Sequence, residues 1–259
     1  MNVGIVTNSN IDKSKEIAQK ISSNLTKDNI ENKILDIDSL ENGFDFVLAI
    51  GGDGTMLKTA RYYSTTKTAV MGVNLGRLGF LSLIKPTEID TISNIIKNKE
   101  YETQERIMLE ANNIKALNDF VIKGCSNNRT AKFELHINNE QVFDCIADGL
   151  VISTPTGSTA YGLSAGGPVL SPCLNCVVIV PICAHTMTVR PIVIPDTEKI
   201  TVKCENMSAS ADGQQTVSNL KELTISKSND SAILAFPKNE FFYSILKNKL
   251  YWGASALNV

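Results

Sequence analysis

The sequence predicts an α/β N-terminal domain followed by a β-rich C-terminal domain. Over residues 1–100, short apolar runs alternate with helical patterns, which is typical of a parallel sheet covered by helices. From about residue 101 the pattern changes to many short strand-like segments separated by turn residues. We therefore expect domains at 1–100 and 101–237. Residues 238–259 contain a final helical pattern that should pack back on the first domain, because its apolar face would otherwise be exposed.

The first domain should contain four strands and three helices. The expected strands are 3–6, 33–37, 46–50 and 69–74. Apolar residues at helical spacing mark a helix through Ile17 and Leu25, a second through Met56 and Ala60, and a third from Thr87 to Ile96. In the second domain the clearest expected strands are 132–137, 149–153, 177–180 and 199–204, and the final helical pattern covers 241–250.

Composition excludes several classes of protein. The chain has 259 residues, of which 43% are hydrophobic and 20% charged, as in ordinary globular proteins. Its formal net charge of -2 gives no broad cationic field, so we expect neither nucleic acid nor a membrane surface as partner. No leader peptide and no apolar run of about 20 residues is evident, which favours a cytoplasmic protein.

The six cysteines are interpreted as reduced thiols, because a disulfide framework is not expected in such a protein. Cys173 and Cys176 form a CxxC motif that could join Cys183 and His185 around a zinc ion. The strand expected between Cys176 and Cys183 would hold them roughly 23 Å apart, at about 3.3 Å per residue. We therefore predict no metal-ligating set.

The most informative motif is GGDGT at residues 51–55. It connects a buried strand to a helix, and such a glycine-rich turn presents backbone N–H groups to a phosphate. Asp53 in its centre would repel a polyphosphate, unless it accepts a proton from an attacking hydroxyl or helps to hold magnesium. The motif thus indicates phosphoryl transfer to an alcohol. The alternative is a tight turn in which Asp53 merely caps the next helix.

Two further loops support a nucleotide site. Residues 74–80 follow a strand and supply glycines, one cation and Phe80, although Phe80 could simply belong to the core. Residues 148–168 are dense in hydroxyls and glycines, and Tyr161 could stack on an aromatic base. As an alternative, such runs are often solvated loops.

With these motifs in place, the sequence closely resembles the NAD kinase family, specifically its compact bacterial type, over essentially the whole chain. The resemblance rests on an ordered set of motifs: GGDGT at 51–55, NLGRLGFL at 74–81, LND at 117–119, DGLVISTPTGSTAYGLSAGGP at 148–168, PICAHTMTVRPIVIP at 181–195 and DGQ at 212–214. Kinases of lipids and sugars share the GGDG turn but not this ordered set.

The resemblance implies that the enzyme phosphorylates the adenosine ribose 2'-hydroxyl of NAD to give NADP, with ATP as phosphate donor and with Mg²⁺ or another divalent cation. Asp53 would be the general base. The α/β domain would bind nucleotide and phosphate, the β-rich domain would bind NAD and mediate oligomerisation, and the active site would lie between them. The usual assembly in the family is a homotetramer.

The resemblance also assigns binding residues. Gly51, Gly52 and Gly54 would line the phosphates near Asn74 and Phe80, and Lys58 would reach a phosphate. Asn118 and Asp119 match an Asn-Glu pair that holds a ribose, so the shorter Asp119 is a departure from the family pattern. The other positions that match NAD contacts are Asp148, Thr159, Ala160, Tyr161, Ser164 and Gln214, and Arg129 lies where the family often has a basic residue.

Two alternatives remain open at the level of sequence. A lipid or sugar kinase could use the same GGDGT turn, although a lipid substrate would need an apolar cleft and the 148–168 loop is polar. A non-catalytic dinucleotide sensor could bind NAD without turnover, although Asp53 beside phosphate would gain it nothing. The sequence does not decide between ATP, other triphosphates and polyphosphate as donor, nor whether NADH is accepted.

Overall fold

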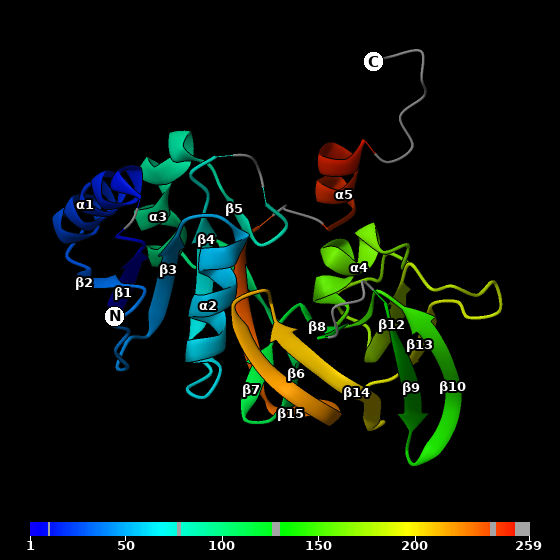
Figure 1. Cartoon of the computed structure of the whole chain (residues 1–259). Coiled ribbons are helices and arrows are strands. Elements are labelled where there is room, and N and C mark those ends of the chain that lie inside the picture. The colour runs from blue at the N-terminus through cyan, green and yellow to red at the C-terminus, as the bar shows by residue number, and fades with distance from the viewer. Residues whose placement is uncertain (10, 77–78, 126–129, 239–241, 252–259) are drawn as a thin grey trace. The chain divides into compact units, whose positions relative to one another are not determined.

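The computed structural model divides into two compact units. It describes residues 1–259 except 10, 77–78, 126–129, 239–241 and 252–259 (Figure 1). Unit 1 comprises Met1–Glu105 together with Ala232–Val259, and unit 2 comprises Arg106–Ser231. Unit 1 is therefore built from both ends of the chain, whereas unit 2 is one continuous segment. Among the described residues, no helix is long and apolar enough to cross a membrane.

Unit 1 is organised around a parallel sheet. Its strands, in spatial order, are β2 (Glu31–Asp36), β1 (Asn2–Thr7), β3 (Phe46–Ile50), β4 (Ala69–Val73) and the end of β15 (Gln215–Pro237), and β5 (Ser82–Ile84) also pairs with β4. Every residue of β3 is buried, as expected for a strand covered on both faces. Since β3 and β4 are parallel neighbours, the loops that follow them leave the same edge of the sheet.

Helices cover both faces of this sheet. They are α1 (Asp12–Lys27), α2 (Asp53–Tyr63), the short 3-10 helix η1 (Pro86–Thr91) and α3 (Ile92–Lys97). Unit 1 also contains the helix α5 (Phe242–Leu250). Ile17 and Ile21 of α1 pack in one core cluster with Phe46, Leu48 and Ile50. These alternate residues of β3 share a face, so α1 and α3 lie on that side, and α2 covers the other (Figure 1).

Unit 2 is an antiparallel β structure. One path of paired strands runs β13 (Ile192–Pro195), β12 (Cys176–Ile182), β11 (Gly149–Ser153), β8 (Asp119–Gly124), β14 (Ile200–Ala211) and the beginning of β15. The β9 (Ala131–Ile137) and β10 (Glu140–Ala147) hairpin joins β14, and β6 (Tyr101–Ala111) pairs with β7 (Ile114–Ala116) and β15. The core includes Phe120, Phe133 and Ile152, each 0% exposed. Between β11 and β12 lie the short helices η2 (Thr156–Thr159) and α4 (Tyr161–Ser164).

The predicted fold class, α/β followed by β-rich, is confirmed, with two local differences. The single helix expected from Thr87 to Ile96 is divided into η1 and α3, and Pro86 starts the first of them. The strand expected at 199–204 extends to Ala211, although its pairing with β15 becomes irregular between Lys203 and Met207. Such an irregularity interrupts the alternation of side chains from which strand length is predicted.

Candidate active site

The glycine turn connects the buried strand β3 to helix α2. The Gly51 N–H donates to the Val73 carbonyl oxygen at 2.9 Å, which fixes the turn to the neighbouring strand. A side chain at Gly51 would overlap the Thr55 hydroxyl, so the position requires glycine. Gly52 and Gly54 are exposed, and Gly52 is the residue that precedes the first turn of α2. The N-terminus of a helix carries the positive end of the helix dipole and attracts anions, so this turn is suited to a phosphate.

The Asp53 carboxylate is held by three consecutive backbone N–H groups. Phe80 donates to Oδ2 at 2.9 Å, and Leu81 and Ser82 donate to Oδ1 at 3.1 and 3.2 Å. The side chain is nevertheless 30% exposed. A Cβ at Gly79 would overlap the same carboxylate, so glycine is needed there as well. The alternative in which Asp53 merely caps α2 is therefore wrong, because its side chain makes no capping hydrogen bond within the described chain. The loop after β4 fixes the carboxylate in position instead.

Asn74 shapes that loop through its side chain. Its Oδ1 accepts the Gly76 N–H at 2.6 Å, and its Nδ2 donates to the Ser82 carbonyl oxygen at 3.3 Å. Asn74 is only 2% exposed. Its amide thus supports the backbone that holds Asp53. Arg77, the cation that the sequence assigned to this loop, lies outside the described residues.

Two lysines near the turn have different partners. Lys58 lies one turn along α2, and its Nζ is 2.5 Å from Asp38 Oδ1. Lys249, in the last turn of α5, has its Nζ 3.8 Å from Asp53 Oδ2 and 4.4 Å from the centroid of the Phe80 ring. In the sequence, Lys249 is marked only as one charge at the end of a helical pattern. Lys58, which the resemblance assigned to a phosphate, is thus paired with Asp38, and the cation beside Asp53 is Lys249.

In unit 2, a second carboxylate ties together the segments that carry the predicted NAD contacts. Asp212 accepts the backbone N–H groups of Leu117, Asn118 and Asp119 at 3.0, 2.7 and 3.2 Å. The Asn118 carbonyl oxygen accepts the Thr154 N–H at 2.9 Å, and a side chain at Gly157 would overlap this carbonyl group. Residues 117–119, 153–157 and 212 therefore form one hydrogen-bonded cluster.

Asp119 is buried in this cluster, with 4% of its surface exposed. Its pKa is raised from 3.8 to about 7, mainly by burial and also by the negative charge of Asp212, while a backbone hydrogen bond from Tyr161 acts in the opposite direction. Asp119 stands where the resemblance implies a longer glutamate, and its carboxyl group lies well inside unit 2.

The hydroxyls of the 148–168 loop divide into two groups. Ser153, Thr154 and Ser158 are buried and satisfy backbone carbonyls: Thr154 Oγ1 donates to Leu117 at 2.6 Å and Ser158 Oγ to Pro155 at 2.8 Å. These buried hydroxyls hold the fold, and they are not among the residues of this loop that the resemblance assigned to NAD. The accessible residues follow directly, as Thr159 and Ala160 are half-buried and Tyr161 and Ser164 exposed.

The remaining predicted contacts are spread over other loops of unit 2. Asp148 is half-buried, and its N–H donates to the Ile182 carbonyl oxygen at 3.0 Å. Gln214 is exposed in the turn between β14 and β15, where Gly213 has a φ of +65°. Tyr161 lies near a cation, with Lys123 Nζ 6.0 Å from its ring centroid. Arg129 lies outside the described residues.

Arg106 is a buried cation that the sequence did not single out. It is 5% exposed, and its Nη1 donates to Thr156 Oγ1 at 3.2 Å. Burial lowers its pKa to about 10. In the sequence, Arg106 is one charged residue in a polar strand, and such a side chain is ordinarily solvated. No local pattern therefore predicts its contact with the hydroxyl-rich loop.

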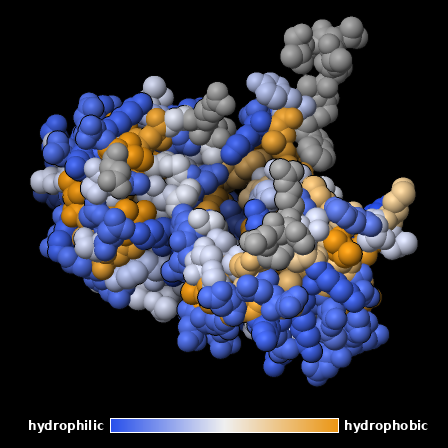
Figure 2. Space-filling view, viewed as in Figure 1, coloured by the Kyte–Doolittle hydropathy of each residue, from blue (hydrophilic) through white to orange (hydrophobic). Residues whose placement is uncertain are grey.

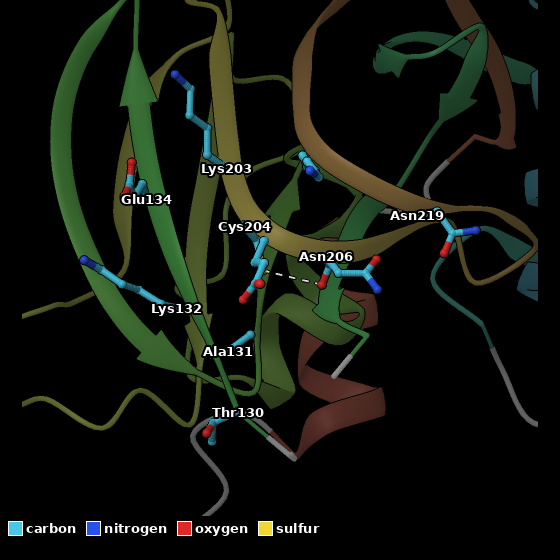
Figure 3. A pocket seen from close by; sticks show the side chains of 10 residues that line it. Thr130, Ala131, Lys132, Glu134, Lys203, Cys204, Asn206 and Asn219 are labelled. Carbon is cyan, nitrogen blue, oxygen red and sulfur yellow. Dashed lines mark hydrogen bonds between the residues drawn. The ribbon is translucent and has the colours of Figure 1, made fainter. Parts of the chain in front are cut away.

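The described residues that line a broad hollow in unit 2 include none of the predicted site residues (Figure 3). It has a volume of about 1050 Å³ and is lined mainly by polar residues of β9, β14 and β15. Lys203 on its wall pairs with Glu222 at 3.4 Å, and Lys132 pairs with Asp144 at 3.1 Å. The neighbouring β9–β10 hairpin has a mostly hydrophilic surface in the view of Figure 2. We regard the hollow as a solvated surface of the sheet.

Among the described residues, no group of three or more His, Cys, Asp or Glu side chains is arranged to hold a metal ion. Cys173 and Cys176 are free thiols, as are the other four cysteines.

A parallel sheet with a glycine turn at its carboxyl edge, and a fixed carboxylate in that turn, has the features expected of a phosphotransferase that acts on an alcohol. Comparison with known proteins specifies the family. Residues 6–101 match the ATP-NAD kinase N-terminal domain, and residues 117–235 match the ATP-NAD kinase C-terminal domain. The chain belongs to the ATP-NAD kinase family, and its reaction is accordingly the phosphorylation of NAD to NADP.

Relatives and solved structures agree with this assignment. The NAD kinase of Thermoanaerobacter sp. (strain X514) is 35% identical over 96% of this chain and 98% of the relative. That of Flavobacterium johnsoniae is 36% identical over 85% of this chain and 80% of the relative. An NAD kinase from Archaeoglobus fulgidus, solved in complex with ATP, superposes with a TM-score of 0.80 at 27% identity, over 97% of this chain and 99% of that one. Yeast NADH kinase, complexed with NADH, has the same fold, with a TM-score of 0.87 at 22% identity over 98% of this chain and 88% of that one.

Proposed function

We propose that Asp53 is the general base in a direct transfer of the terminal phosphoryl group of ATP to the adenosine ribose 2'-hydroxyl of NAD. A bond forms between the ribose oxygen and the γ-phosphorus, and the bond to the β–γ bridging oxygen breaks. ADP departs with that electron pair, and the hydroxyl proton passes to Asp53. The main support is that the carboxylate is fixed by three N–H donors yet remains 30% exposed, in the first turn of α2.

The glycine turn is proposed to hold phosphate oxygens through Gly51, Gly52 and Gly54. The exposed Gly52 directly before α2 and the exposed Gly54 in its first turn support this role, because a helix N-terminus stabilises negative charge without a cationic side chain. Gly51 would contribute by fixing the turn, since its N–H donates to the Val73 carbonyl oxygen. Asn74 would act by shaping the loop, and Phe80 would present its ring beside the carboxylate. Lys58 would have to exchange its pairing with Asp38 for a phosphate, so we assign it the smallest contribution of this group.

The divalent cation is proposed to arrive with the nucleotide, as MgATP. The described side chains contain no ligand cluster for a resident ion, and Mg²⁺ commonly binds through substrate phosphates and water with one or two carboxylates. When bound, the ion would neutralise charge on the phosphate oxygens. Asp53 is the carboxylate available in the turn to face such a complex.

The residues of unit 2 are proposed to bind NAD. Asn118 and Asp119 would hold a ribose, with their backbone positions set by Asp212. The accessible residues Thr159, Ala160, Tyr161 and Ser164 would contact the dinucleotide, together with Asp148, Gln214 and Arg129. The exposed Tyr161 ring is suited to stacking on a base, since it carries an apolar face at the surface.

We further propose that the enzyme is a cytoplasmic homotetramer. The resemblance to the family implies that a neighbouring subunit completes part of the NAD site. Dissociation of the tetramer would therefore weaken NAD binding. Size-exclusion chromatography with light scattering tests this directly. A monomer that retained full activity would contradict it.

The first experiment measures NADP formed from NAD, ATP and Mg²⁺ with an NADP-specific dehydrogenase, for wild type and Asp53→Asn. We expect the variant to lose about 10²- to 10⁴-fold in kcat, because it cannot accept the hydroxyl proton. Its Kd for NAD, measured calorimetrically, should change little. NAD binding with no ATP consumption by the wild type would instead favour a dinucleotide sensor. Near-normal kcat in Asp53→Asn would refute the base assignment alone.

A further inference from the structure

The C-terminal helix α5 brings a cation to the proposed base. Lys249 lies in its last turn, with Nζ 3.8 Å from Asp53 Oδ2 and 4.4 Å from the Phe80 ring centroid. Phe80 also donates its N–H to the same Asp53 oxygen. One ammonium group therefore touches both the carboxylate and the residue that holds it. Lys249 and Asp53 are each 30% exposed, so the pair is accessible from solvent.

Packing of α5 does not account for this placement. The helix buries Ile245 and Leu246, each 6% exposed, and these side chains anchor it. Cations near a helix C-terminus interact favourably with its dipole, but this applies equally to Lys247, which is exposed. The dipole explains why lysines occur in the last turn. It does not explain why Lys249 faces a carboxylate and an aromatic ring.

Lys249 is also not needed to hold Asp53 in place, because three backbone N–H groups already do so. A hydrogen bond between ammonium and carboxylate would be about 2.7–2.9 Å long. At 3.8 Å the contact between Lys249 and Asp53 is one of charge, and the ammonium keeps its donors for another acceptor. An oxygen of the transferred group, the anion that the neighbouring turn is proposed to hold, can serve as that acceptor.

The charges of the site favour this assignment. A carboxylate beside a triphosphate is repulsive, and an adjacent ammonium cancels that repulsion. Cations aimed at the transferred phosphoryl group also stabilise its transition state. Lys58, the cation nearest to the turn in sequence, is paired with Asp38 at 2.5 Å. Lys249 has no such competing carboxylate among its contacts within the described chain.

We propose that Lys249 is a further catalytic residue, whose ammonium group binds the transferred phosphoryl group beside Asp53. The inference rests on the proposed role of Asp53. Lys249 keeps its proton throughout, while Asp53 takes the proton of the attacking hydroxyl. The last turn of α5 thereby becomes part of the active site.

The test compares Lys249→Met, Lys249→Arg and the matched control Lys247→Met, each in the full-length chain. For each variant, kcat, KM for NAD and ATP, and the melting temperature are measured. Lys249→Met should lower kcat about 10²-fold, as removal of one donor to a developing charge does, with little change in KM for NAD. Lys249→Arg should recover about a tenth of wild-type kcat or more, because it keeps the charge. Lys247→Met should stay within about twofold of wild type.

Three results would overturn the proposal. Normal kcat in Lys249→Met would remove any catalytic role, and increased kcat would make Lys249 a blocking residue. Equal losses in Lys249→Met and Lys247→Met, accompanied by lower melting temperatures, would indicate helix packing alone. Asp53→Asn is assayed in parallel: if it stays active the proposed base fails, whereas an inactive Asp53→Asn with an active Lys249→Met rejects only the role of Lys249.

Discussion

Asp53 in unit 1 and Asp212 in unit 2 bind the backbone in the same way but in different surroundings. Asp53 accepts the N–H groups of residues 80–82, and Asp212 those of residues 117–119. Beside Asp53 lie a helix N-terminus and the Lys249 ammonium. Beside Asp212 lies the buried carboxyl group of Asp119. The same three hydrogen bonds therefore fix a group suited to reaction in one unit and a structural anchor in the other.

The comparison predicts that displacing the Asp53 carboxylate from its three N–H donors lowers kcat more than it lowers the free energy of unfolding. In Gly79→Ala the added methyl group would overlap the Asp53 carboxylate and push it from its position. We expect kcat to fall about 10²- to 10³-fold, since such displacements of catalytic groups are costly. Steady-state kinetics and thermal unfolding together measure the effect.

Gly76→Ala is the matched control in the same loop, because nothing lies within 4 Å of a Cβ at that position. It should retain activity. If Gly79→Ala were as active as Gly76→Ala, the position of Asp53 would not matter and the comparison would fail.

Removing the Asp212 anchor should cost stability. In Asp212→Ala, three backbone N–H groups lose a charged acceptor, and we expect a loss of about 3 kcal/mol in the free energy of unfolding. Urea denaturation measures it. Asp144→Ala serves as control, since it removes an exposed carboxylate paired only with Lys132 at 3.1 Å and should change stability by less than about 1 kcal/mol. Equal losses in the free energy of unfolding for the two substitutions would show that the hydrogen bonds of Asp212 do not stabilise unit 2.

The smallest expected effect is the dependence of the free energy of unfolding on pH that comes from Asp119. Asp119 has a folded-state pKa of about 7 against 3.8 in the unfolded chain, so the folded state binds the extra proton between these values. The stabilisation is full below about pH 4 and is lost as pH rises to about 7. Between about pH 5 and pH 7 we expect the free energy of unfolding to fall by about 2 kcal/mol from this group.

Asp119→Asn should remove this part of the pH dependence, as measured by urea denaturation at several pH values. Asp212→Ala should make it shallower, because the like charge of Asp212 contributes to the raised pKa. An identical pH slope in wild type and Asp119→Asn would exclude Asp119 as its source.

Local sequence patterns predicted most of the fold and the reacting turn. Strand 149–153 was predicted with the bounds of β11, and the buried run 46–50 with those of β3, because apolar runs and turn residues are local signals. The family resemblance supplied the substrate.

The sequence could not show which polar side chains make hydrogen bonds or ion pairs within the protein. Thr154 and Ser158 look like ligand hydroxyls but bond to backbone carbonyls. Lys249 and Arg106 look like solvated charges but contact Asp53 and Thr156. These contacts join residues far apart in the chain, and neither periodicity nor composition records such pairings.

The division of unit 1 between the two ends of the chain affects the order in which the enzyme forms during synthesis. Domains generally fold as units, N-terminal first, as the chain emerges from the ribosome. Here residues 106–231 are complete before residues 232–259 exist, so unit 2 can fold while the sheet of unit 1 still lacks the end of β15. Asp53 is made before unit 2, whereas Lys249 is made only after it. A prematurely terminated chain would therefore carry the loops of unit 2 without a complete phosphate-transfer site.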